Sequence, residues 1–129
     1  MSFIRFVVHK LDEQSERRQG LFQAMGDLLD DGRLNEYERI RYKELYQWFN
    51  DNLEKPLDLA RSKKVHAKNV ALSWFKDSAQ EHISRMRELI VILEANGIEV
   101  VTLTSEKPGY VVYEDDYQVA AEPFKETQT

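Results

Sequence analysis

The spacing of apolar residues changes twice along this chain, and that change limits the possible folds more than any other feature. Residues 3–9 contain Phe, Ile and Val without Gly or Pro, as strands do. Three later stretches, between residues 13 and 96, repeat apolar side chains every three or four positions, the period of a helix face. After Gly97 branched residues alternate again. The order strand, helices, strands predicts an α+β domain.

The first strand should present different residues to its two sides. Alternation places Ile4, Phe6 and Val8 on one face, and we expect these three side chains in the core. Phe3 and Val7 then point the other way. If helices cover only one face of the sheet, apolar side chains of the second face stay uncovered.

Helices are expected over residues 13–31, 35–53 and 78–96. Asn35 and Glu38 have the spacing of a capping box at the start of the second helix. A glycine follows the first and the third helix, where it can adopt the left-handed conformation that ends a helix.

Three strands are expected after the last helix, over residues 98–104, 110–113 and 117–121. Turns separate them, so they would form an antiparallel meander, which the N-terminal strand could join as a fourth member. The predicted fold is therefore α+β, with an antiparallel sheet of three to four strands and three main helices packed on one face. The pattern leaves the conformation of residues 54–77 open.

The whole chain, residues 1–129, is expected to form a single domain, because 129 residues is the usual size of one hydrophobic core. We expect residues 124–129 to be a flexible tail. The absence of cysteine excludes disulfides and thiolate sites and is typical of a reducing compartment. No apolar run reaches the roughly 20 residues of a membrane span. The simplest expectation is a cytoplasmic protein without membrane contact.

Charge is distributed unevenly along the chain. The formal net charge is −5, from 18 basic and 23 acidic residues. Residues 61–76 hold five of the basic residues and no acidic one, so the remainder carries 13 basic and 23 acidic residues, or −10. Such a basic connecting segment can attract an acidic protein or a phosphate-bearing ligand. Nucleic acid is a weaker candidate partner, because the chain as a whole is acidic.

The candidate ligand-binding residues of this segment combine cations with an aromatic ring on which a ligand could stack. They are Arg61, Lys63, Lys64, His66, Lys68, Trp74 and Lys76. The alternative interpretation is a solvated connection, with Trp74 and Phe75 in the core.

The sequence has no P-loop, dinucleotide glycine fingerprint, His-Glu-x-x-His element or nucleophile elbow. The histidines, His9, His66 and His82, are dispersed over the chain. The acidic cluster at 27–31 lacks the ligand spacing of a calcium loop and is more simply interpreted as solvation of a helix end. The cluster at 114–116 places three carboxylates in one turn, which could hold a hard cation, although charged hairpin turns are common on soluble sheets. We therefore predict no catalytic residue, no resident metal and no cofactor.

Three parts of the chain resemble small bacterial proteins of unknown function. They are residues 73–79, residues 86–89 with 92–94, and residues 108–115. The resemblance implies a bacterial cytosolic setting and no particular activity.

The sequence favours a non-catalytic binding or accessory module that engages an acidic protein or a phosphate-bearing ligand through its basic segment. One alternative is a homodimer that associates through the uncovered apolar sheet face, unless Pro123 and Phe124 fold over that face. The other is a small enzyme in which His66 or His9 meets a carboxylate or hydroxyl group.

Overall fold

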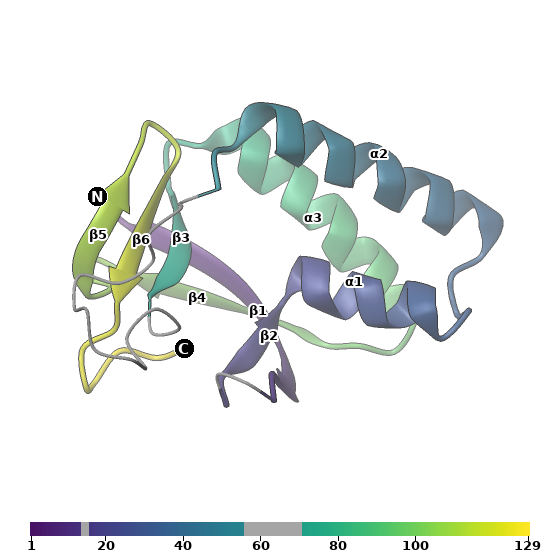
Figure 1. Ribbon diagram of the computed structural model, residues 1–129, viewed down its shortest axis with the longest axis horizontal. Helices are drawn as coiled ribbons and strands as arrows, with labels where there is room; N and C mark the ends of the chain where they lie inside the picture. Colours follow the sequence, from purple (N-terminus) through teal and green to yellow (C-terminus); the bar gives the residue numbers. More distant parts are fainter. Residues whose placement is uncertain (14–15, 56–70) are drawn as a thin grey trace.

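Three helices lie against one side of a six-stranded antiparallel sheet in the computed structural model, counted over the residues that it describes, 1–13, 16–55 and 71–129 (Figure 1). The strands are β1 (Phe3–Leu11), β2 (Arg18–Gly20), β3 (Leu72–Lys76), β4 (Val100–Ser105), β5 (Tyr110–Glu114) and β6 (Gln118–Glu122). The helices are α1 (Leu21–Asp30), α2 (Glu36–Asn52) and α3 (Gln80–Ala95). The predicted α+β class is confirmed, whereas the predicted three to four strands are too few.

β2 arises inside the stretch that was expected to be the first helix. Beyond β1, the N–H of Asp12 donates to the main-chain oxygen of Arg17 at 2.7 Å, and Glu16 has a φ of 59°. Arg18–Gly20 then pairs with the end of β1. The residues before Leu21 have no apolar face to bury, and α1 begins only where the apolar period begins.

The predicted three-stranded meander is also wrong. β4 pairs with β1 rather than with β5, and β3 lies between β1 and β6. β3 comes from the stretch whose conformation the pattern left open. As a strand it buries Trp74 on one face of the sheet and turns Phe75 toward the helices on the other, so each large ring packs in its own apolar cluster.

The main core lies between the helices and one face of the sheet. Phe6 and Val8 are buried in it and Ile4 packs against it, as the alternation predicted. The helices contribute side chains such as Leu45 and Leu89, which are 0% exposed. Burial of these aliphatic side chains stabilises the domain by roughly 1.5–3 kcal/mol each.

The predicted capping box is present at the start of α2. The N–H of Glu38 donates to Asn35 Oδ1 at 2.8 Å, and the N–H of Asn35 donates to Glu38 Oε1 at 3.0 Å. Among the described helices, none combines the length and the apolar content needed to cross a membrane.

The other face of the sheet is wrapped around a second, smaller apolar cluster. Its buried described members are Val7, Trp74, Leu103 and Val119, one from each of four strands. β4 and β5 are the two edges of the row β4-β1-β3-β6-β5, yet only residues 106–109 join them. A flat row would hold these edges about 19 Å apart. An extended chain from Ser105 to Tyr110 reaches about 17 Å at most, so the row must bend.

Because the row of strands bends, more of the second sheet face is covered than the alternation of side chains along the strands predicts. Val7, expected on that face, is 0% exposed. The residues expected as a tail lie against strands: the Phe124 ring is 4.7 Å from the Tyr110 ring, and the main-chain oxygen of Thr129 accepts a hydrogen bond from Arg18 Nε at 2.9 Å.

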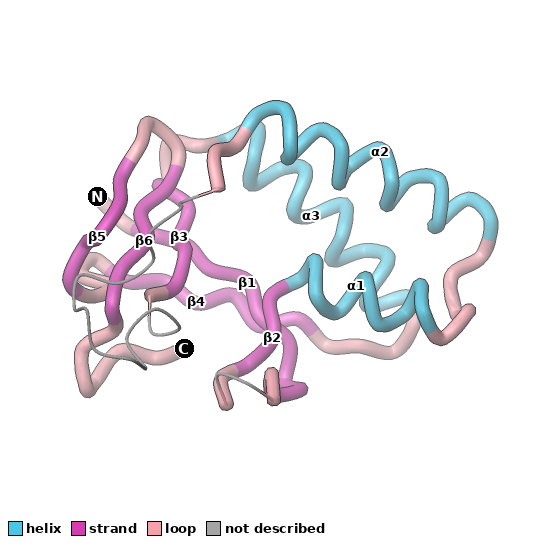
Figure 2. Tube along the Cα trace, in the orientation of Figure 1, coloured by secondary structure: helices cyan, strands magenta, loops and turns pink. Residues whose placement is uncertain are grey.

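One edge of β1 is interrupted. β4 pairs along the first edge of β1. The second, interrupted edge pairs with β3 at residues 3–4 and with β2 at Val7 and Leu11. Figure 2 shows β3 near the start of β1 and β2 near its end. Residues 5–6 therefore have no strand partner on this side within the described part of the chain, and the sheet splits beside the first turn of α1.

Candidate functional site

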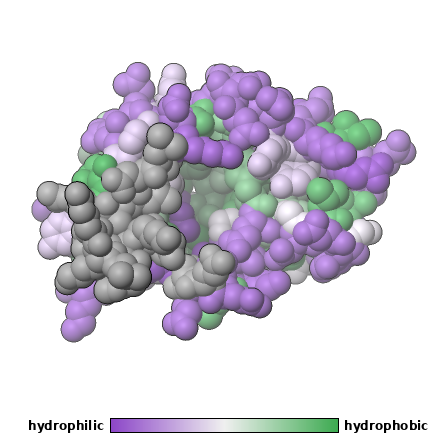
Figure 3. All heavy atoms as spheres, viewed as in Figure 1, coloured by the Kyte–Doolittle hydropathy of each residue, from purple (hydrophilic) through white to green (hydrophobic). Residues whose placement is uncertain are grey.

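The split between β2 and β3 opens into a hollow of about 340 Å³, here called the cleft. Its apolar wall includes Phe22, Leu53, Phe75 and Met86, which come from all three helical regions and from β3. Figure 3 shows a hollow near the middle of this face, with apolar atoms at its base and polar residues around it. The volume lies at the lower end of the range of small-molecule sites.

Arg5 is one of two cations, with Lys55, among the described residues that line the cleft. It sits at the interrupted edge of β1, where its Nη1 donates to the main-chain oxygen of Ser73 at 3.0 Å. Its Nε is buried and has no hydrogen-bond partner, and among the described residues no carboxylate forms an ion pair with it. Burial, together with the nearby charges of Arg17 and Arg18, lowers the pKa of Arg5 to about 10. The group therefore stays charged at neutral pH, in surroundings that penalise its charge.

The first turn of α1 borders the same cleft. Gly20, at the N-cap position, offers no side chain to accept from the first N–H groups, and this turn carries no acidic residue. Gly20, Leu21 and Gln23 all line the cleft. The first N–H groups of a helix lack an intrahelical acceptor and carry the positive end of its dipole. The start of α1 therefore adds a second source of positive potential beside Arg5.

The rim of the cleft is the short segment 53–55 that follows α2, and two buried polar side chains fix it. His82 Nε2 lies 2.8 Å from the main-chain oxygen of Asn52, so the ring carries its hydrogen on Nε2. Gln118 Nε2 donates to the main-chain oxygen of Glu54 at 2.7 Å. His82 and Gln118 are only 5% and 3% exposed. Because both partners are largely shielded from water, these contacts hold the rim in one position.

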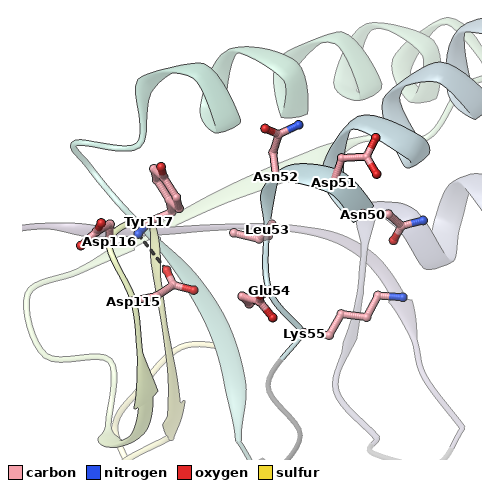
Figure 4. A pocket seen from close by; sticks show the side chains of 9 residues that line it. All are labelled: Asn50, Asp51, Asn52, Leu53, Glu54, Lys55, Asp115, Asp116 and Tyr117. Carbon is pink, nitrogen blue, oxygen red and sulfur yellow. Dashed lines mark hydrogen bonds between the residues drawn. The ribbon is translucent and has the colours of Figure 1, made fainter.

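A larger hollow, of about 600 Å³, lies next to the cleft and shares residues 53–55 with it. Figure 4 shows Glu54 across from Asp115, which belongs to the turn between β5 and β6. The oxygens of Asp115 accept hydrogen bonds from the Tyr117 N–H at 2.8 Å and from the Tyr113 hydroxyl at 2.9 Å. Burial alone would raise the pKa of Asp115, but these bonds and those from Gln118 outweigh it and hold the pKa below its usual value. Asp115 thus serves the turn, and its oxygens are already used.

The acidic residues of this larger hollow do not form a metal centre. In the ranges 1–13, 16–55 and 71–129, no three His, Asp or Glu side chains are close enough to hold a cation. Asp27, from the first acidic cluster, accepts hydrogen bonds from Lys10 and Gln19 at 3.2 Å each.

The structure brings few of the residues predicted from the sequence into one place. Arg61, Lys63, Lys64, His66 and Lys68 lie outside the described residues. Trp74 is 1% exposed, and its ring belongs to the second apolar cluster. The Nζ of Lys76 lies 2.7 Å from Glu114 Oε2 in an ion pair that is mostly buried on the lysine side.

The hypothesis of a small enzyme requires His66 or His9 to meet a carboxylate or hydroxyl group, and among the described residues His9 contacts a carboxylate. His9 Nε2 is 3.1 Å from Glu99 Oε1, and both side chains are mostly exposed. This pair lies at a different hollow from Arg5, between the end of β1 and the segment after α3.

Sequence reasoning missed Arg5, although the signal was present. Arg5 is the one charged residue in the run Phe3–Val8, which is otherwise apolar. Burial of a charge within a strand is costly unless something compensates for it. A lone cation in such a strand is therefore a candidate for binding.

In comparisons with protein-family models, with curated proteins and with solved structures, the chain has no match. The functional argument accordingly rests on the geometry of the cleft.

Proposed function

We propose that this protein is a non-catalytic binding module that takes a small anion with an apolar body into the cleft. The observation that carries this proposal is that Arg5 and the uncapped start of α1 border the same apolar cleft. The cysteine-free composition fits action in a reducing compartment, which we take to be the cytoplasm.

The energetics of Arg5 support an anionic ligand. A partly desolvated guanidinium without a carboxylate partner weakens the folded state, because water is no longer available to solvate its charge. A bound carboxylate or phosphate would restore that solvation through charge-assisted hydrogen bonds to the guanidinium group. The N–H groups at the start of α1 favour the same sign of charge.

The apolar wall supports a ligand with a hydrophobic part. Phe22, Leu53 and Phe75 are partly exposed and would lose contact with water when an apolar body enters. Met86 adapts to ligands of irregular shape, because its side chain is unbranched and polarisable. A bare inorganic anion would leave this surface wet, so we expect it to bind more weakly than an amphipathic one.

The proposal is tested by titrating the protein with 8-anilinonaphthalene-1-sulfonate, a fluorescent anion with an apolar body. Three variants are compared with the wild type: Arg5→Gln, Arg5→Lys and, as the matched control, Arg87→Gln on the exposed side of α3. We expect Arg5→Gln to weaken binding by at least about thirtyfold, as loss of a buried charge partner does. Arg5→Lys should retain part of the affinity because it keeps the charge without the planar fork.

The control variant removes the same charge from an exposed residue that does not line the cleft, and it should leave the dissociation constant within about twofold of wild type. Circular dichroism and thermal unfolding establish that each variant is folded. Equal binding by wild type and Arg5→Gln, or equal losses in Arg5→Gln and Arg87→Gln, would overturn the proposal.

A further inference from the structure

We infer that the ligand is a linear aliphatic monocarboxylate, whose head group binds Arg5 and whose chain passes Phe22 into a neighbouring hollow. This inference rests on the proposed function and specifies its ligand.

The charged residues around the cleft favour a ligand that carries a single negative charge. Among the described residues that line the cleft, Arg5 is accompanied by one more cation, Lys55, and by one carboxylate, Glu54. Asp115 and Asp116 line the adjoining larger hollow. A polyphosphate would place several charges near these carboxylates on a chain that already carries −5. One carboxylate can instead sit against Arg5 and the N–H groups of α1 at the far side of the cleft.

In the part of the cleft lining that the structure describes, the polar groups are too few to recognise a base or a sugar. The amide of Gln118 is used by Glu54 and Asp115, and the amide of Gln23 donates to Asp12 at 2.7 Å. A nucleotide or sugar phosphate would leave its own donors and acceptors unmatched against the apolar wall, which is costly. An alkyl chain has no such groups to satisfy.

The volumes of the cleft and of a neighbouring hollow limit the length of the ligand's alkyl chain. With a water volume of ~30 Å³ as the measure, a cleft of about 340 Å³ accommodates roughly ten non-hydrogen atoms. A second hollow of about 300 Å³, here called the side hollow, shares Phe22, Leu53 and the rim with the cleft. Tyr46 and Phe49 form its far wall, and neither of them lines the cleft. A longer chain would therefore continue past Phe22 toward Tyr46.

Phe22 is held at this junction by aromatic contacts. Its ring meets the rings of Phe49 and Tyr46 edge-on, with centroids 5.1 Å and 5.9 Å apart. These contacts fix the turn that an alkyl chain must take between the two hollows.

The test is a titration with the straight-chain carboxylates from hexanoate to dodecanoate, all below the concentrations at which they form micelles. We expect the affinity to rise about fourfold with each added methylene while the chain is being buried. Decyl phosphate, 1-decanol and inorganic phosphate complete the set of probes. The carboxylate should bind tighter than each of these three.

The variant Tyr46→Ala removes a wall of the side hollow and replaces no residue that lines the cleft, while Phe22 keeps its ring contact with Phe49. It should bind hexanoate as the wild type does and lose the gain for chains longer than octanoate. Thermal unfolding of Tyr46→Ala shows whether the fold is retained. Tyr37→Ala on α2, where Tyr37 is 74% exposed, is the matched control and should leave the whole series unchanged.

The outcomes separate this inference from the proposed function. Binding that depends on Arg5 but is independent of chain length, or that favours decyl phosphate over decanoate, overturns the ligand class and leaves the anion site standing. A series that rises equally in Tyr46→Ala and in the wild type beyond octanoate overturns the path past Phe22. Absence of any binding that depends on Arg5 overturns both.

Discussion

Arg5 reaches across the break in the sheet to Ser73, whose main-chain oxygen accepts a hydrogen bond from Arg5 Nη1 at 3.0 Å. This single neutral acceptor does not balance the charge, because the Nε stays unpaired and burial lowers the pKa of the group to about 10. The free protein thus keeps a cation in an unfavourable place.

Replacement of Arg5 by Met should therefore strengthen the free protein while it removes binding. We expect the free energy of unfolding to rise by about 1–2 kcal/mol, as when a buried charge is replaced by an apolar side chain of similar volume. Urea unfolding measures the first effect and dye titration the second. A variant that loses both stability and binding would show that Arg5 is structural.

Gly20→Asp should also separate stability from binding. Gly20 has φ −75° and ψ 172°, which any residue adopts, and a Cβ built there meets nothing within 4 Å. An aspartate would cap the first N–H groups of α1 and stabilise the helix by about 0.5 kcal/mol. Its carboxylate would occupy the place of the ligand head group, so affinity should fall at least tenfold. Gly20→Ala, which adds neither cap nor charge, is the control and should bind normally.

Stability in acid should depend on Asp115. The pKa of this carboxyl is below its usual value in the folded protein, so its contribution is present above the unfolded pKa and is lost as the pH falls through the folded pKa. At neutral pH, Asp115→Asn should cost about 1 kcal/mol, after allowance for partial exposure. Between pH 5 and pH 2 the gap between variant and wild type should close. A gap that widens in acid would contradict the assignment.

The basic segment offers a direct comparison with the cleft. If Arg5 anchors the ligand, the double variant Lys63→Gln/Lys64→Gln should change the affinity for the fluorescent anion by less than about threefold at 0.15 M salt. The control is Lys107→Gln/Lys125→Gln, which removes two exposed charges elsewhere. A loss of tenfold or more in the first variant alone would assign the recognition to residues 61–68 instead.

Gly109 should not tolerate a side chain. Its φ is 151°, and a Cβ there would lie 2.0 Å from the main-chain oxygen of Glu122. Gly109→Ala should lower the free energy of unfolding by at least about 2 kcal/mol, measured by urea titration. The same change at Gly26, inside α1 and with open space around it, should instead stabilise by about 0.5–1 kcal/mol. Equal effects at both glycines would show that the close approach to Glu122 relaxes at little cost.

Sequence patterns predicted the features of this fold that depend on residues close together in the chain. The faces of β1, with Phe6 and Val8 inward, and the capping box of Asn35 and Glu38 follow from alternation and spacing alone. The strand order does not, because β3 enters between β1 and β6 through contacts between residues far apart in sequence. No local period reveals that Trp74 and Phe75 serve two different clusters.

The candidate site was hidden for the same reason. Arg5 stands out only as a lone cation in an apolar strand, and Gly20 has an ordinary place before a helix. Their meeting depends on β2 and β3 pairing with opposite ends of β1, which is a property of the assembled sheet. The acid-free interval 61–76 was the more visible signal in the sequence, because clustered charge can be counted without knowledge of the fold.

The gap on β1 is set by main-chain pairing registers rather than by the side chains that surround it. A descendant of this chain could therefore change the charge at position 5 with no need to rebuild the scaffold. The apolar wall is different, because Met86 lines the cleft and is also a buried member of the main core, so a change there would alter binding and folding together.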